Sequence, residues 1–283
     1  MPLSMRELLE AGAHFGHQTH RWNPKMKPYI YGQRNGIYII NLEQTVNQWK
    51  KARQAIVDSV AKGKKVLFVG TKPQVQDTLQ EEAQRAKQFY VNKRWLGGML
   101  TNFRTIKKRI DRLEEIDAIK ASDKAATMSK KQMLQLDKEF EKLDKSLHGI
   151  RDMRSTPGLV FVIDPKKEHL AIREARRLFI PVIAITDTNC DPEGIDYVIP
   201  SNDDALKSIS LFLKDAADAC LSGGKAFEEK IQEESRRRLK EEAEAKKAQE
   251  QAQETQESTS SEEEVVKTSV TSSKEQFAAR TGE

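Results

Sequence analysis

The stretch that decides the fold is LVFVIDPKKEHLAIREARRLFIPVIAI, residues 159–185. It begins with the apolar run Leu159–Ile163, continues with an amphipathic segment over residues 166–179, and ends with a second apolar run, Pro181–Ile185. Short, solidly apolar runs are typical of strands that are buried on both faces of a parallel sheet. The order strand, helix, strand therefore predicts one unit of an α/β fold.

Three further apolar runs extend this pattern along the chain. They cover residues 65–69, 89–91 and 197–199, and further amphipathic helices are expected over residues 74–87 and 203–220. The alternation predicts a doubly wound parallel sheet. We expect this α/β sheet domain to comprise residues 1–102 and 154–224.

Residues 103–153 interrupt the alternation. Apolar residues recur there at spacings of three and four in two arms, Phe103–Leu113 and Met133–Leu147, on either side of the polar stretch 121–129. This spacing is typical of helices that pack along one seam, as in a coiled coil. We expect residues 103–153 to form an inserted antiparallel helical hairpin, with an ordinary helix pair as the alternative for arms this short.

The charge balance changes after residue 224. Residues 225–283 contain 11 lysines and arginines against 15 aspartates and glutamates, whereas residues 1–224 contain 37 against 28. Residues 225–283 have almost nothing apolar to bury, so we expect a charged helix that fades into a disordered tail. The basic balance of residues 1–224 indicates a polyanionic partner.

The composition also bears on location. No apolar run approaches the roughly 18–20 residues that span a bilayer, and no secretory signal is apparent, so no membrane partner is expected. Cys190 and Cys220 form neither a disulfide framework nor a CxxC pair. These observations favour a cytoplasmic protein with reduced thiols.

Acidic residues at two predicted strand ends raise the possibility of a nucleotide-binding or phospho-acceptor site, because Asp164 and Asp187 lie where doubly wound folds often bind ligands. Structural roles explain the same residues. Asp164 precedes Pro165 as a helix N-cap would, Thr71 could cap the next helix, and the residues after Asp187 suit a turn. The sequence lacks GxGxxG, GxxxxGK[ST], GxSxG and HExxH. We therefore predict that the protein is not an enzyme and requires no cofactor.

Three histidines, His14, His17 and His20, are numerous and close enough in the sequence to suggest a zinc site. Gly12 and Gly16 disfavour a helix that would place them on one face, and no cysteine or carboxylate lies within the segment. A zinc site is therefore the minor alternative. We favour histidines that belong to an RNA-facing loop.

Two segments free of acidic residues, 11–42 and 88–110, favour RNA as the polyanion. Lysine and arginine contact phosphates, asparagine and threonine bond sugars or base edges, and tryptophan stacks on unpaired bases. Trp95 could equally fasten the root of the hairpin to the sheet. The candidate RNA-binding residues are His14, His17, His20, Arg21, Trp22, Asn23, Lys25, Lys27, Arg34, Asn35, Lys93, Arg94, Trp95, Thr101, Asn102, Arg104, Lys107 and Lys108.

Motifs within and beyond these segments resemble the bacterial-type small-subunit ribosomal protein S2 family. The resemblance covers about residues 3–225 and rests on Gly12-Ala-His-Phe-Gly-His17, Trp22-Asn-Pro-Lys-Met26, Tyr29-Ile-Tyr-Gly32, Arg34-Asn-Gly-Ile37, Arg94-Trp-Leu-Gly-Gly98, Leu100-Thr-Asn102, Ile180–Asp187, Asn189–Pro192 and Asp196. It implies a flavodoxin-like sheet with a protruding helical hairpin. It also implies a place on the small ribosomal subunit, contact with small-subunit rRNA and other small-subunit proteins, and help in docking ribosomal protein S1. No DNA partner is expected.

Overall fold

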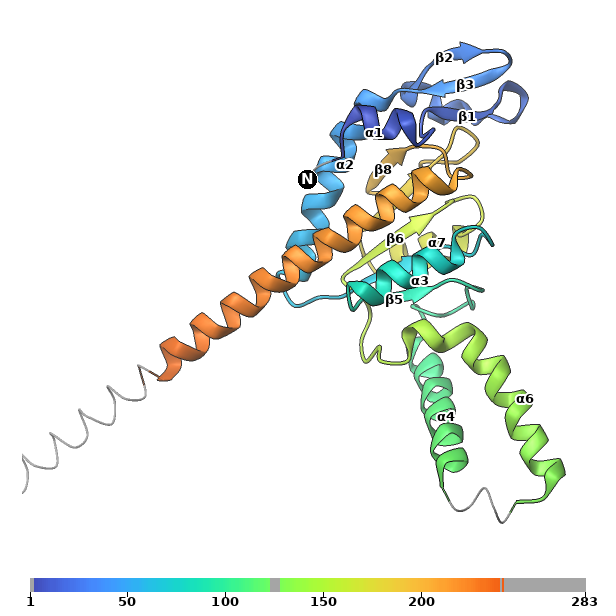
Figure 1. Cartoon of the computed structure of the whole chain (residues 1–283), viewed down its shortest axis with the longest axis vertical. Coiled ribbons are helices and arrows are strands. Elements are labelled where there is room, and N and C mark those ends of the chain that lie inside the picture. The colour runs from blue at the N-terminus through green and yellow to red at the C-terminus, as the bar shows by residue number, and fades with distance from the viewer. Residues whose placement is uncertain (1–2, 123–127, 240, 242–283) are drawn as a thin grey trace, which may run out of the picture. The chain divides into compact units, whose positions relative to one another are not determined.

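The computed structural model describes residues 3–122, 128–239 and 241 (Figure 1). The chain divides into two compact units, Met1–Phe227 and Glu228–Glu283. None of the described helices is long and apolar enough to cross a membrane.

A five-stranded parallel sheet forms the centre of the first unit. Its strands are β4 (Val66–Val69), β5 (Phe89–Val91), β6 (Leu159–Ile163), β7 (Val182–Thr186) and β8 (Tyr197–Pro200), in the order β5-β4-β6-β7-β8. All five strands predicted from apolar runs are confirmed. The strand order reverses between β4 and β6, and this reversal defines a doubly wound sheet.

Alternate residues of the strands supply two separate cores. Phe68 and Phe161 are register partners that face one core, which is completed by α2 (Leu42–Val60), α3 (Gln76–Arg85) and the helix that begins at residue 206. Leu67 and Val160 face the other core, beneath α7 (His169–Arg177) and the root of the hairpin. Both faces of the sheet are covered, and this explains why the strands are apolar throughout.

The hairpin consists of α4 (Phe103–Ala121) and α6 (Lys130–Leu147), followed by the short 3-10 helix η3 (His148–Ile150). Ion pairs Arg112–Glu139 and Lys120–Asp137 join the two helices. The predicted antiparallel hairpin is confirmed, although residues 123–127 of its polar connection lie outside the described part of the chain (Figure 1). Gly149 is required at its root, because a Cβ there would overlap the carbonyl oxygen of Tyr90.

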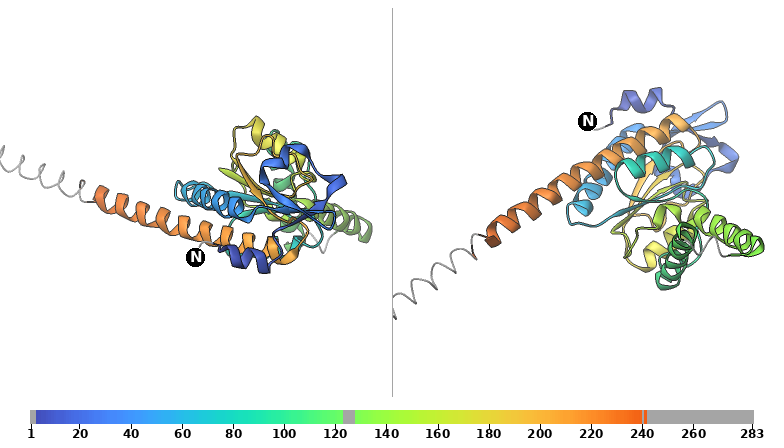
Figure 2. Two further views of the ribbon diagram at one scale, coloured as in Figure 1. Left: turned by 90° about the horizontal axis from the view of Figure 1, so that it is seen from above. Right: turned by 60° about the horizontal axis from the view of Figure 1, so that its bottom comes forward.

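A second, antiparallel sheet follows the N-terminal helix α1 (Met5–Glu10). It comprises β1 (Phe15–Gln18), β2 (Ile30–Arg34) and β3 (Ile37–Ile40) in the order β1-β3-β2, with the 3-10 helices η1 (Thr19–Arg21) and η2 (Pro24–Tyr29) between β1 and β2. The expectation of a loop is therefore wrong for His17, which lies on β1, and for His20, which lies in η1, whereas His14 lies in the turn before β1. The small sheet and the hairpin lie at opposite ends of the first unit (Figures 1 and 2).

The helix that begins at residue 206 continues past the glycines at 223 and 224, where the sequence suggested a boundary. A Cβ at Gly223 would lie 2.7 Å from the carbonyl oxygen of Val57, so this glycine allows the helix to pack tightly on α2. Residues 228–239 of the second unit are helical and exposed, which confirms the charged helix. The predicted disorder falls on residues 242–283, which lie outside the described part, and the predicted domain boundaries stay predictions.

Candidate nucleic-acid interface and the carboxyl edge of the sheet

The crevice at the switch point between β4 and β6 is filled by side chains of the chain itself. Thr71 follows β4, and its backbone N–H donates to Oε1 of the buried Glu168 at 3.1 Å. The hydroxyl of Thr71 donates to the same oxygen. Thr71 therefore does not cap α3, contrary to expectation, since the residue before that helix is Val75. Internal hydrogen bonds occupy the position where other doubly wound proteins bind ligands.

Lys72 lies beside this crevice among three carboxylates. Its Nζ is 3.0 Å from Asp164, 2.7 Å from Asp203 and 2.9 Å from Asp204. Burial by itself lowers the pKa of Lys72, but Asp203, Asp204 and Asp164 outweigh that effect and raise it. Lys72 is thus held as a cation inside an acidic cluster, where it is not free to bind a phosphate.

Asp164 has a different capping role from the one expected. Its backbone adopts φ +63°, and its Oδ1 accepts hydrogen bonds from the backbone N–H groups of Lys166 and Lys167. Helix α7 begins only at His169, so Asp164 caps the preceding turn and not the helix itself. The turn predicted after Asp187 is present, closed by the Cys190 N–H bonded to the Asp187 carbonyl.

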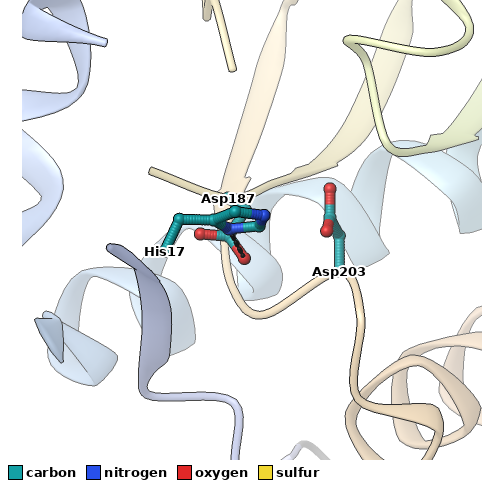
Figure 3. Close-up of side chains that lie close together, drawn as sticks. All are labelled: His17, Asp187 and Asp203. Carbon is teal, nitrogen blue, oxygen red and sulfur yellow. Dashed lines mark ion pairs between the residues drawn. The ribbon is translucent and has the colours of Figure 1, made fainter. Parts of the chain in front are cut away.

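His17 on β1 faces the end of β7 (Figure 3). Its Nδ1 is 3.0 Å from Oδ2 of Asp187 and its Nε2 is 3.5 Å from Oδ2 of Asp204. The hydrogen bond with Asp187 raises the pKa of His17 against the opposing effect of burial. Both ring nitrogens of His17 therefore face carboxylates of the chain itself, and the RNA contact predicted for His17 stays a prediction.

Gly16 makes this approach of the two sheets possible. A Cβ at this position would lie 2.7 Å from the Thr188 side chain. The next backbone N–H, that of His17, donates to Oγ1 of Thr188 at 2.9 Å. The backbone N–H of Asn23 donates to the carbonyl of the same threonine at 2.8 Å. The turn after β7 therefore fastens the small sheet to the edge of the large one.

Two groups of possible metal ligands occur in the described part of the chain. They are His17, Asp187 and Asp203, and Asp164, Cys190 and Asp203, with ligand atoms within 4.8 Å of one another in each group. Burial, reinforced by Asp164 and Asp187, raises the pKa of Asp203 to about 7. The first group has the ligand types that divalent cations prefer. It includes neither His14 nor His20, so the three histidines are not assembled as a joint ligand set.

Residues of the small sheet and its turns account for ten of the eighteen RNA-binding candidates. His14 is half-buried and its Nδ1 has no hydrogen-bond partner among the described residues, and burial lowers its pKa. Trp22 and Asn23 are half-buried; Trp22 packs on Tyr38 with ring centroids 5.0 Å apart. Exposed candidates in this segment are His20, Arg21, Lys25, Lys27, Arg34 and Asn35. Lys25 is paired with Asp191 and Glu193, while Arg21, Lys27 and Arg34 have no carboxylate within 4.0 Å among the described residues.

The remaining candidates follow β5, and most are exposed. Lys93, Arg94, Thr101, Asn102, Arg104, Lys107 and Lys108 reach solvent. Trp95 does not, since it is 6% exposed and its Nε1 donates to Oε1 of Glu174 at 3.1 Å. Of its two predicted roles, the structure shows the structural one, and Trp95 is not available to stack on a base.

Glu174 on α7 organises this segment and was not identified from the sequence. Its carboxylate accepts hydrogen bonds from the backbone N–H groups of Gly98, Leu100 and Thr101, and from the Thr101 hydroxyl, at 2.7–3.1 Å. Together with the bond from Trp95, the carboxylate of Glu174 accepts five hydrogen bonds. The buried carboxylate thus fixes the loop from which the basic start of the hairpin emerges.

These features define a class of doubly wound α/β proteins that carry exposed basic segments and lack a glycine-rich phosphate loop. A family model described as Ribosomal protein S2 matches residues 8–223. The chain is also 57% identical over 230 residues to the small ribosomal subunit protein uS2 of Geotalea uraniireducens (strain Rf4). The matched residues cover 81% of this chain and 90% of the relative. The chain belongs to the ribosomal protein S2 family, a family of structural ribosomal proteins, and the predicted family is confirmed.

Proposed function

We propose that the chain is a non-enzymatic component of the small subunit of the bacterial ribosome, in the cytoplasm, and binds small-subunit rRNA through its two acid-free segments. The observation that carries the proposal is that the cations of these segments are exposed. Arg34 extends from the small sheet, Arg21 and Lys27 from the 3-10 helices between its strands, and Arg104, Lys107 and Lys108 from the start of α4. Exposed lysines and arginines without nearby carboxylates are suited to neutralise phosphates.

The proposal includes protein partners. The relative from Geotalea carries the name of a small-subunit protein. By family membership, we propose contacts with other small-subunit proteins and a part in docking ribosomal protein S1. The exposed carboxylates around the edge of the sheet, such as Asp204 and Glu193, suit a protein partner better than RNA, because they repel phosphates.

The electrostatic mechanism is tested by the salt dependence of binding to a transcript of small-subunit rRNA. If roughly six phosphates are neutralised, the log–log slope of affinity against salt should be about −4 to −5. The double variant Arg21→Ala, Arg34→Ala should flatten the slope by about two, because each lost phosphate contact removes about one.

Lys50→Ala, Lys51→Ala is the matched control, since both lysines are exposed on α2 and their removal changes the net charge equally. It should leave the slope close to that of the unmodified chain. Equal slopes for the two double variants would show that the arginines of the small sheet do not contact RNA. Binding that does not change with salt would overturn the electrostatic mechanism as a whole.

A further inference from the structure

A hollow of about 460 Å³ lies at the root of the hairpin, between the segment after β5 and helices α4 and α6. We call it the basic hollow. Its cationic residues are Lys93, Arg94, Arg109, Lys142 and Lys145, and its apolar residues are Leu96, Leu143 and Leu147. Ser146 completes the lining, so no acidic side chain contributes to it.

The five cations of the basic hollow differ from four other cations on or beside the hairpin, which are paired with carboxylates. Arg112, Lys120, Arg151 and Arg154 each lie within 4.0 Å of a carboxylate, on Glu139, Asp137, Asp117 and Glu114 respectively. Among the described residues, none of the five cations of the hollow has such a partner. Lys93 instead donates to the amide oxygen of Gln76 at 2.7 Å. Clustered cations without counter-charges raise the local concentration of anions.

The apolar lining distinguishes this hollow from a simple phosphate site. Leu147 is fully buried, and Leu96 and Leu143 are half-buried. A phosphate ion gains nothing from leucine side chains, whereas an unstacked base gains from an apolar surface. A concave site with an apolar lining and a few charged groups is the usual form of a site for one small organic group.

The loop that forms one wall is held rigidly. Trp95 lies between Arg94 and Leu96, is buried, and donates to Glu174. The same carboxylate accepts from the backbone of Gly98 at 2.7 Å. The wall is therefore formed before any ligand arrives, which reduces the entropy lost on binding.

We propose that the basic hollow binds one unpaired nucleotide of rRNA, with its base against Leu96 and Leu143 and its flanking phosphates on the surrounding lysines and arginines. The proposal rests on the proposed function, because it takes RNA as the ligand. It adds a binding site whose residues on α6, Lys142 and Lys145, belong to neither acid-free segment. It also specifies an unpaired nucleotide, which a basic surface alone does not.

Photo-crosslinking to small-subunit rRNA tests the position of the base. The full chain with Leu143→p-benzoylphenylalanine should crosslink to a single unpaired nucleotide. The same substitution at Leu134, which is 56% exposed on the same helix but outside the hollow, should not reach that nucleotide. No crosslink at position 143, or a crosslink only to paired nucleotides, would overturn the proposal.

Affinity measurements test the cations. Lys142→Ala, Lys145→Ala should weaken binding of the rRNA transcript by about tenfold or more at low salt, because two phosphate contacts are lost. The control Lys130→Ala, Lys131→Ala removes the same charge from exposed positions of α6 outside the hollow and should have little effect. Equal losses in the two pairs would refute a specific role for the hollow.

Free adenosine monophosphate distinguishes the source of the nucleotide. It should not displace rRNA at millimolar concentration, because it lacks the second flanking phosphate; displacement would make the hollow a site for free nucleotides. The experiments distinguish an error in the site assigned to the basic hollow from an error in the proposed rRNA binding. If the α6 variants bind normally while Arg21→Ala, Arg34→Ala still flattens the salt slope, only the hollow is wrong.

Discussion

Glu174 lies on the buried side of α7 and joins that helix to the loop before the hairpin. Its five hydrogen-bond donors come from residues 73 to 79 positions earlier in the chain. Burial acts to raise the pKa of Glu174, but the hydrogen bonds from Thr101, Trp95, Leu100 and Gly98 outweigh it, so the pKa is lowered from its ordinary value. The carboxylate therefore remains ionised inside the protein and holds the loop.

Replacing Glu174 with glutamine should destabilise the protein by about 2 kcal/mol, because an amide NH₂ cannot accept the hydrogen bonds made to the second oxygen. A carboxyl whose folded pKa is lowered stabilises the fold above the unfolded pKa and loses that contribution as the pH falls through the folded pKa. Urea denaturation should therefore show stability falling more steeply below about pH 4.5 for the unmodified chain than for Glu174→Gln.

The exposed Glu81 of α3 provides the control for this pH dependence, because it has no hydrogen-bond or ion-pair partner among the described residues. Glu81→Gln should leave both the stability and its pH profile almost unchanged. Parallel profiles for Glu174→Gln and the unmodified chain would contradict the lowered pKa.

At single positions, the sequence predicted the chemical character of a side chain better than it predicted what that side chain contacts in the fold. Acid-free segments correctly indicated where exposed cations lie, but they did not indicate that His17 faces Asp187, and they left both roles of Trp95 open. Those outcomes depend on residues 170 and 79 positions away, beyond any local pattern. Glu174 was missed because a glutamate between two arginines in a helix resembles a solvated ion pair.

The helices of the hairpin pack through an apolar seam that α4 supplies with four buried residues, Ile106, Ile110, Leu113 and Ile116. Leu113→Ala should destabilise the protein by about 2–5 kcal/mol, because the side chain is fully buried and leaves a cavity. Arg112→Ala should destabilise the protein far less than Leu113→Ala, since the pairs of Arg112 with Glu115 and Glu139 are exposed to solvent. Denaturant unfolding of both variants measures the difference.

A larger effect for Arg112→Ala than for Leu113→Ala would contradict the view that the seam, and not the ion pairs, holds the hairpin. Both variants should show the same slope of free energy against denaturant as the unmodified chain. An altered slope in either would indicate that the hairpin unfolds separately from the sheet.

Helices and strands with a regular pattern of apolar residues were predictable from the sequence. Strands whose positions depend on the turns between them were less predictable. The parallel strands and both hairpin arms follow the apolar pattern. The small antiparallel sheet was missed, although Asn35-Gly36 is a hairpin signal and both residues adopt positive φ, +52° and +72°. Its strands are short and only partly buried, so their apolar pattern was weak.

The charge of the whole chain is unevenly distributed along the sequence. Residues 240–283 contain 6 lysines and arginines against 11 aspartates and glutamates. Removing them should strengthen binding to rRNA several-fold at low salt, because the chain loses charge of the same sign as RNA. The gain should shrink as added salt shortens the screening length from about 30 Å at 0.01 M to 10 Å at 0.1 M.

A chain in which residues 240–283 are replaced by a glycine-serine segment of equal length is the control, and it should bind as the truncated chain does. Unchanged affinity after truncation would show that the acidic segment does not repel RNA. Weaker binding would show that it contributes to the interface.

Many proteins of this architecture bind ligands at the carboxyl edge of the parallel sheet. In this chain, residues of the small sheet and its turns occupy that edge. Gly16, His17 and Asn23 are seated on Thr188 and Asp187, and the backbone N–H of Asn202 donates to Ala13 at 3.0 Å. These contacts oppose movement of the small sheet relative to the edge of the large sheet. If RNA binds both the small sheet and the hairpin as proposed, these contacts would help to set the separation of the two RNA segments.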